Sequence, residues 1–105
     1  MTADPVQLEI EKGVATVRLN QPEVRNALTH ELRTAFRDVV GSLEFNEDVR
    51  CVVITGAGNH FMAGGDIRAM VERLKVDQIE RRKLILEGIH LLHLPLFAIR
   101  RMGKP

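Results

Sequence analysis

The sequence predicts an α/β fold, because three different patterns of apolar residues follow one another along its 105 residues. Apolar and polar residues first alternate in two short segments, which is the period of a half-buried strand. They then recur at helical spacing. A nearly continuous run rich in β-branched residues comes next, which is typical of a strand covered on both faces. The predicted order is strand, strand, helix, strand, and the length suits one domain.

The two alternating segments predict an antiparallel hairpin. Residues 6–12 and 14–19 each place an apolar side chain at every second position. Lys12-Gly13 lies between them and has a composition typical of a tight turn. We expect the alternating apolar side chains of both strands to face the core.

The helix that follows has one apolar and one polar face. Its apolar positions recur between Leu28 and Leu43, while Arg33 belongs to the polar face. Thr29 precedes the first turn and is a typical N-cap. Residues 49–54 then form the buried strand of a parallel or mixed sheet with helices packed on it.

A glycine-rich loop at residues 55–66 and two further helices complete the predicted fold. Glycine allows backbone angles that other residues rarely adopt, and loops of this kind at strand ends often build binding sites. A short helix at about residues 67–74 has Asp66 as its N-cap, and a longer one runs from about residue 77 to 101. Pro95 predicts a kink or a break near residues 91–95.

The composition argues against several classes of function. Lys and Arg number 15 against 14 Asp and Glu, and the chain has four Phe, no Trp and no Tyr. We expect no nucleic-acid partner, because such binding needs a basic stripe or exposed aromatic residues. Cys51 is the single cysteine, which favours an inert buried thiol in a reducing cytoplasm. We expect neither secretion nor membrane spanning, because a leader pattern and an apolar stretch of ~20 residues are both absent.

Two common phosphate-binding motifs do not fit the glycine-rich loop. Residues 55–61 begin as G-x-G, but Phe61 stands where the dinucleotide fingerprint needs Gly or Ala. The P-loop is excluded because the sequence has no Gly-Lys-Ser or Gly-Lys-Thr. Residues 63–67 instead combine small residues with a helix start, which lets a ligand oxyanion approach backbone amides. A plain glycine-rich turn with an Asp N-cap is the alternative.

Three short segments carry a family resemblance. Residues 19–28, Leu-Asn-Gln-Pro-Glu-Val-Arg-Asn-Ala-Leu, are similar to the LNxPxxxNAL motif of the enoyl-CoA hydratase/isomerase (crotonase) superfamily. Residues 61–67 resemble its FxAGxDI loop, and residues 100–105 resemble the segment that leads into its next buried strand. The resemblance implies that residues 1–105 are an acyl-CoA-binding, N-terminal part of a crotonase-like fold, truncated relative to the family.

The resemblance also implies which residues bind the acyl-CoA thioester. In this family two backbone amides hold the thioester oxygen as it becomes an enolate, and the first corresponds to Gly65. Main-chain groups of both motifs line the adenine pocket, and Asp66 is a helix cap rather than an acid or base. Arg25 and Arg68 match basic residues near the nucleotide phosphates, or are solvated surface arginines. The implied set is Arg25, Ala27, Ala63, Gly64, Gly65, Asp66, Ile67 and Arg68.

The implied reaction is hydration of a 2-enoyl-CoA. The family's second oxyanion amide and acid–base glutamates have no counterpart before Pro105, so we expect little or no turnover from this chain. Isomerase, dehalogenase or hydrolase chemistry is an alternative for the full-length parent, because all share a thioester enolate. A non-catalytic CoA-binding or partner-binding fragment, with apolar residues 84–102 as its association surface, is another.

The resemblance implies no cofactor, because coenzyme A is part of the substrate. We expect no metal site either, since His90 and His93 lack a third ligand at useful spacing. The expected partner is an acyl-CoA thioester, and the full-length parent is expected to be a homo-oligomer. No membrane partner is expected.

Overall fold

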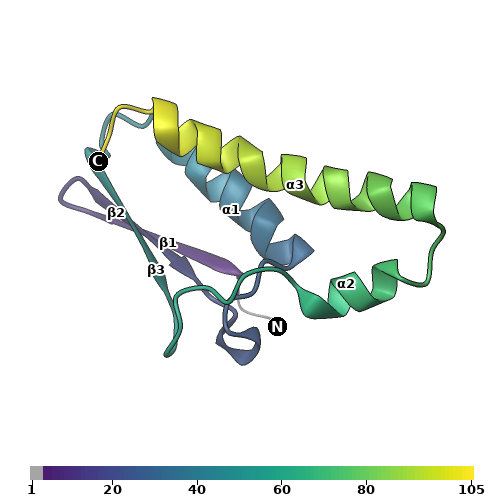
Figure 1. Cartoon of the computed structure of the whole chain (residues 1–105). Coiled ribbons are helices and arrows are strands. Elements are labelled where there is room, and N and C mark those ends of the chain that lie inside the picture. The colour runs from purple at the N-terminus through teal and green to yellow at the C-terminus, as the bar shows by residue number, and fades with distance from the viewer. Residues whose placement is uncertain (1–3) are drawn as a thin grey trace.

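In the computed structural model, which describes residues 4–105, a three-stranded sheet carries two long helices on one face (Figure 1). This mixed architecture confirms the predicted fold class. Its elements in chain order are β1 (Val6–Glu11), β2 (Val14–Leu19), the 3-10 helix η1 (Pro22–Val24), α1 (His30–Leu43), β3 (Cys51–Gly56), α2 (Ile67–Arg73) and α3 (Gln78–Arg101). None of the helices in residues 4–105 has the length and hydrophobicity that a membrane span requires.

The predicted hairpin is confirmed. β1 and β2 are antiparallel, with Val6 opposite Leu19 and Glu11 opposite Val14. Lys12 and Gly13 have φ angles of 52° and 83°, as expected for a two-residue turn with left-handed backbone. The expectation for the apolar face is only partly met, because β1 is an edge strand of which only Val6 is buried. Its remaining apolar side chains, Leu8 and Ile10, are 38% and 42% exposed.

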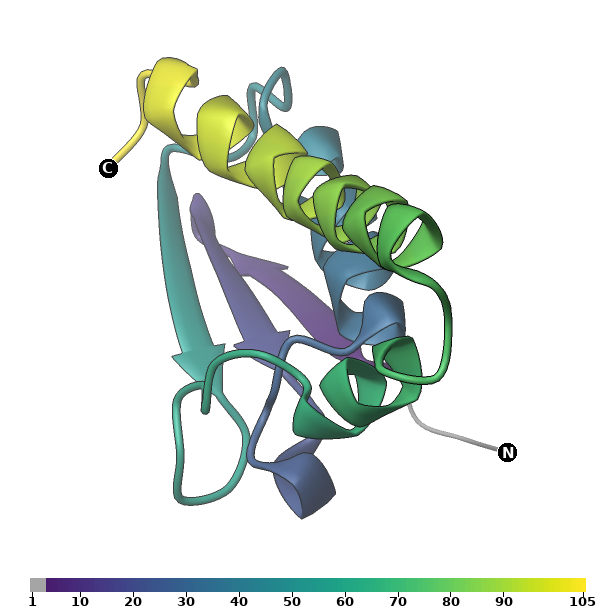
Figure 2. The same cartoon turned by 45° about the vertical axis from the view of Figure 1, so that its right-hand side comes forward.

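β3 runs parallel to β2, which confirms the prediction of a parallel or mixed sheet. The strand begins and ends two residues later than expected, because Val49 lies in the turn before it. The prediction that β3 is covered on both faces is wrong for the described residues. Both α1 and α3 lie on the same side of the sheet (Figures 1 and 2), and Val53 on the other side is 44% exposed.

The core lies between the sheet and α1, and α3 packs along α1. Thr29 caps α1 as predicted, since its hydroxyl accepts from Leu32 N at 3.1 Å. α3 continues through Pro95, so the prediction of a break is wrong. The kink stays a prediction. The Pro95 side chain is fully buried, and Ala98, three residues further along α3, belongs to the core. The buried residues of the core cluster are Val6, Ala15, Val17, Leu19, Leu32, Phe36, Val40, Leu43, Val49 and Ala98.

The last residues close the end of α1. Lys104 Nζ donates at 2.7 Å to the carbonyl oxygen of Leu43, the last residue of α1, and at 2.8 Å to that of Asn46 in the turn that follows. Arg101 forms an ion pair with Glu44 at 2.7 Å. These contacts fix α3 against α1 at the end of the molecule opposite the glycine-rich loop (Figure 1).

Candidate functional site

Asn26 joins the first motif segment to the glycine-rich loop. Its side chain is completely buried. Oδ1 accepts from Gln21 N at 2.8 Å, while Nδ2 donates to Ala57 O at 3.1 Å and to His60 O at 2.9 Å. Asn26 has a φ of 57°, a left-handed conformation that asparagine tolerates better than most residues. One side chain thus holds together segments 31 and 34 residues apart.

A backbone link places the expected oxyanion donor. Leu28 N donates to Gly64 O at 2.8 Å, and Leu28 forms an isolated parallel bridge with Gly65. Gly64 has a φ of 97°, which side-chain-bearing residues rarely adopt. Among residues 4–105 no hydrogen bond occupies the Gly65 amide. The Gly65 N–H is therefore available to an oxygen atom of a ligand.

The loop that leads to this amide is closed by a tight backbone approach. A Cβ at Gly56 would overlap the carbonyl oxygens of His60 and Phe61, so the position requires glycine. Asp66 then starts α2 by accepting from Arg68 N at 3.1 Å, which confirms it as the helix cap. Because α2 has only seven residues, the amide itself rather than a long helix dipole is the feature of interest.

The remaining predicted ligand-binding residues lie around this link. Ala27 is buried between Asn26 and Leu28. Arg25 and Arg68 are exposed and make no ion pair within residues 4–105, so both of their interpretations stay open. The structure brings the two motif segments together, whereas the roles of their residues stay predictions. Ala63 and Ile67 are exposed as well.

An apolar cavity of about 220 Å³ lies beside the link. Leu28 lines it from the first motif segment, and Phe61 and Met62 line it from the glycine-rich loop. α3 contributes Leu92 and Leu96 from the opposite side. The cavity offers space for an apolar group close to the segment that carries the Gly65 amide.

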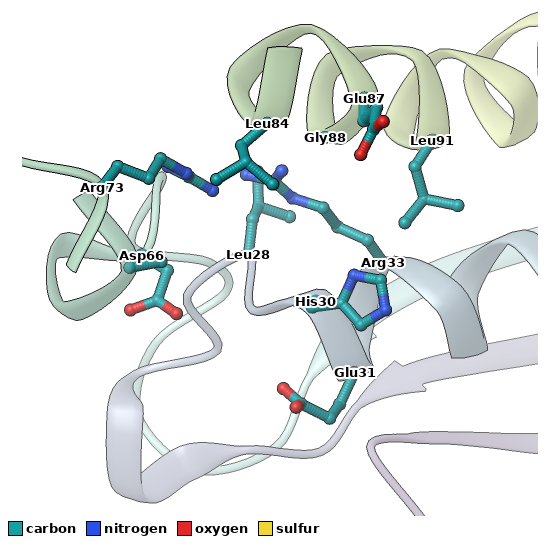
Figure 3. Close-up of a pocket in the computed structure, with 11 residues that line it drawn as sticks. Leu28, His30, Glu31, Arg33, Asp66, Arg73, Leu84, Glu87, Gly88 and Leu91 are labelled. Carbon is teal, nitrogen blue, oxygen red and sulfur yellow. The ribbon is translucent and has the colours of Figure 1, made fainter. Parts of the chain in front are cut away.

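A separate polar pocket of about 430 Å³ lies between α1, α2 and α3 (Figure 3). Arg33 and Arg73 extend into it, and their guanidinium groups are directed toward one another. Burial lowers the pKa of Arg33, the charge of Arg73 lowers this pKa further, and Asp66 acts in the opposite direction. Although Arg33 belongs to the polar face of its helix, it is partly buried because α3 lies over it.

His90 and His93 lie close together on α3. The rings of His90 and His93 are 6.4 Å apart between centroids, in an edge-on arrangement. Within residues 4–105 no three His, Cys, Asp or Glu side chains gather closely enough to hold a metal ion.

Sequence reasoning missed three residues of this region. Asn26 was part of a motif, but nothing local showed that it is buried and bonded to the loop. Arg33 and Arg73 are far apart in sequence, and only the packing of the helices brings them together. Gly88, a glycine inside a helix, was the one available signal, because such a residue costs helix stability and often marks a close approach.

The fold and the glycine-rich loop define a crotonase-like protein. Residues 9–99 match the family described as enoyl-CoA hydratase/isomerase, and the chain belongs to this family. The crystal structure of an enoyl-CoA hydratase from Polaromonas sp. JS666 is similar to this chain, with a TM-score of 0.77 and 32% sequence identity. The similar region covers 95% of this chain and 37% of the Polaromonas chain.

Relatives in other organisms agree with this assignment. The probable enoyl-CoA hydratase EchA14 of Mycobacterium tuberculosis (strain ATCC 25618 / H37Rv) is 43% identical over 67 residues, 64% of this chain and 26% of that protein. The short-chain-enoyl-CoA hydratase of Clostridium acetobutylicum is 36% identical over 105 residues, 93% of this chain and 39% of that protein. The chain thus spans less than half the length of the relatives it matches.

Proposed function

We propose that this chain is the acyl-CoA-binding, N-terminal part of an enzyme that hydrates 2-enoyl-CoA thioesters. The observation that carries the proposal is the Gly65 amide, which no hydrogen bond occupies among the described residues and which the bridge to Leu28 positions. Membership of the enoyl-CoA hydratase/isomerase family supports this choice of substrate.

The Gly65 amide would act on the thioester carbonyl. When water adds to the double bond, the carbonyl oxygen gains negative charge as an enolate forms. A positioned N–H that donates to this oxygen stabilises the transition state by about 3–4 kcal/mol. The apolar cavity beside Leu28 supports binding of the acyl chain, since its lining carries no charged residue.

A titration with coenzyme A tests the binding step. Amide resonances of Gly64, Gly65 and Asp66 in ¹H–¹⁵N spectra should shift in a saturable way, while that of Gly13, in the hairpin turn at the other end of β2, should not. Absence of shifts at the three loop amides would remove the CoA proposal for this chain.

A rate measurement tests the assignment of the other catalytic groups. We assign neither a second oxyanion amide nor an acid–base pair within residues 1–105, and we expect little or no hydration of crotonyl-CoA. A rate close to that of a complete family member would contradict this part of the proposal. We also place the reaction in the cytoplasm, which the lone Cys51 supports.

A second candidate function is association with a partner through α3. From residue 84 onward, six large apolar side chains of this helix are exposed by 40% to 58%: Ile85, Leu86, Ile89, Leu94, Leu96 and Phe97. Sedimentation velocity tests whether the partner is a second copy of this chain. A monomer at all concentrations would count against self-association through α3, and against the homo-oligomer expected of the full-length parent.

A further inference from the structure

The polar pocket between α1, α2 and α3 adjoins the proposed thioester site, because Asp66 belongs to both. Gly64 and Gly65 do not line it, and it shares only Leu28 with the apolar cavity. The proposed hydration reaction uses neither of the two arginines that extend into the pocket. Their arrangement therefore needs an explanation of its own.

Two positive charges converge in this pocket without a partner. The guanidinium groups of Arg33 and Arg73 face each other (Figure 3), and neither takes part in an ion pair within residues 4–105. Arg33 Nε is buried and has no hydrogen-bond acceptor among the described residues. A buried charged donor without an acceptor lowers the stability of the folded protein. An anion bound from solution would supply the missing acceptor.

The fold keeps space for the Arg33 guanidinium. Its Nη1 lies only 2.5 Å from the place where a Cβ at Gly88 would be. Any other residue at this position of α3 would displace the guanidinium group. Glycine at this position therefore leaves the flexible end of the Arg33 side chain where it lies, inside the pocket.

The acidic residues that line the pocket do not supply an acceptor for Arg33 Nε. Asp66 is engaged as the cap of α2, where it accepts from Arg68 N. Glu31 and Glu87 also line the pocket, but neither forms an ion pair with an arginine in the described residues. Within residues 4–105 the two guanidinium groups therefore keep donors that an anion can occupy.

We propose that Arg33 and Arg73 form a binding site for a small oxyanion, a carboxylate or phosphate group. The planar guanidinium presents paired N–H donors that match two oxygens of such a group. The anion would accept from the buried Nε of Arg33 and reduce the repulsion between the two arginines. The same chemistry fits a free anion and a phosphate group carried by coenzyme A.

Arginine side-chain NMR tests the site in the chain as it exists. Inorganic phosphate is titrated at constant ionic strength, and the Nε–Hε resonances of Arg33 and Arg73 should shift in a saturable way. Arg33→Met and Arg73→Met should each weaken binding about tenfold, measured by calorimetry. Arg37→Met is the matched control on the same helix, because Arg37 pairs with Asp38, and it should change affinity by less than about twofold.

Further arms identify the source of the anion. If acetate shifts the Arg33 Nε–Hε resonance as phosphate does, carboxylates bind at the site. If coenzyme A displaces phosphate from Arg33, the anion is a phosphate group of the nucleotide. Either outcome supports the site. No saturable shift, equal shifts with sodium chloride, or unchanged affinity in Arg33→Met would overturn it.

A charge variant covers the case in which the methionine variants fail to fold. Glu87→Gln removes an exposed carboxylate from the pocket lining and should tighten phosphate binding about twofold, because it removes a repulsive charge. An unchanged or weakened affinity would contradict the proposal. This test is independent of the Gly65 amide, so its result does not depend on whether the chain binds thioesters.

Discussion

Replacement of Asn26 by alanine should destabilise the protein more than any other single truncation in the loop region. The change removes three hydrogen bonds from a side chain with no exposed surface. At about 1 kcal/mol each, these bonds amount to about 3 kcal/mol. The left-handed backbone at residue 26 adds about 1 kcal/mol for alanine. We therefore expect Asn26→Ala to lower the free energy of unfolding by about 4 kcal/mol.

Two further variants separate the components of this loss. Asn26→Gly loses the same hydrogen bonds but tolerates the left-handed backbone, so it should be about 1 kcal/mol more stable than Asn26→Ala. Asn59→Ala is the matched control, since Asn59 is exposed in the glycine-rich loop to which Asn26 binds and should change stability by less than about 0.5 kcal/mol.

Urea unfolding followed by circular dichroism measures all three variants. A loss below about 1 kcal/mol for Asn26→Ala would refute the view that this side chain holds the two motif segments together. Equal stability of the alanine and glycine variants would refute the contribution of backbone strain at residue 26.

Four other substitutions have defined outcomes. Gly64→Ala should lower the free energy of unfolding by about 1 kcal/mol and weaken coenzyme A binding, because the φ of 97° suits glycine. Gly41 lies in helical backbone with open space around it, so Gly41→Ala should raise the free energy of unfolding by about 0.5–1 kcal/mol in the same urea experiment. Lys104→Met should cost about 1–2 kcal/mol, measured by the shift of the thermal midpoint, since its ammonium pairs with two carbonyls at the end of α1. Gly56→Ala should displace the loop backbone and broaden or shift the loop amide resonances, and an unchanged spectrum would contradict the tight approach at this glycine.

Features that depend on near neighbours in the sequence were predictable. The hairpin turn at Lys12 and Gly13 and the helix caps at Thr29 and Asp66 all rest on residues within a few positions of each other. The two motif segments could also be recognised by their residues. Their meeting could not be derived locally, because it rests on hydrogen bonds from Asn26 and Leu28 to residues more than thirty positions away.

Features that depend on the packing of whole elements were predicted less well. The apolar run of β3 indicated coverage on both faces, yet sequence pattern alone does not say which elements supply that cover. Pro95 indicated a kink or a break, but α3 continues through this buried proline. Arg33 showed polar spacing on α1, and only the position of Gly88 on α3 reveals that its guanidinium is enclosed.

The contacts that hold the chain together near the loop are also the contacts that position the proposed donor. Asn26 binds the backbone of the loop before Gly65, and two residues later Leu28 bridges Gly65 itself. A change that loosens the first contact should therefore also disturb the second. This coupling separates a binding site from a plain glycine-rich turn. Under conditions in which both variants are folded, Asn26→Gly should weaken coenzyme A binding, whereas Lys104→Met, at the opposite end of the molecule, should not. Equal effects of the two variants on binding would show that the loop amide is not the element that recognises the ligand.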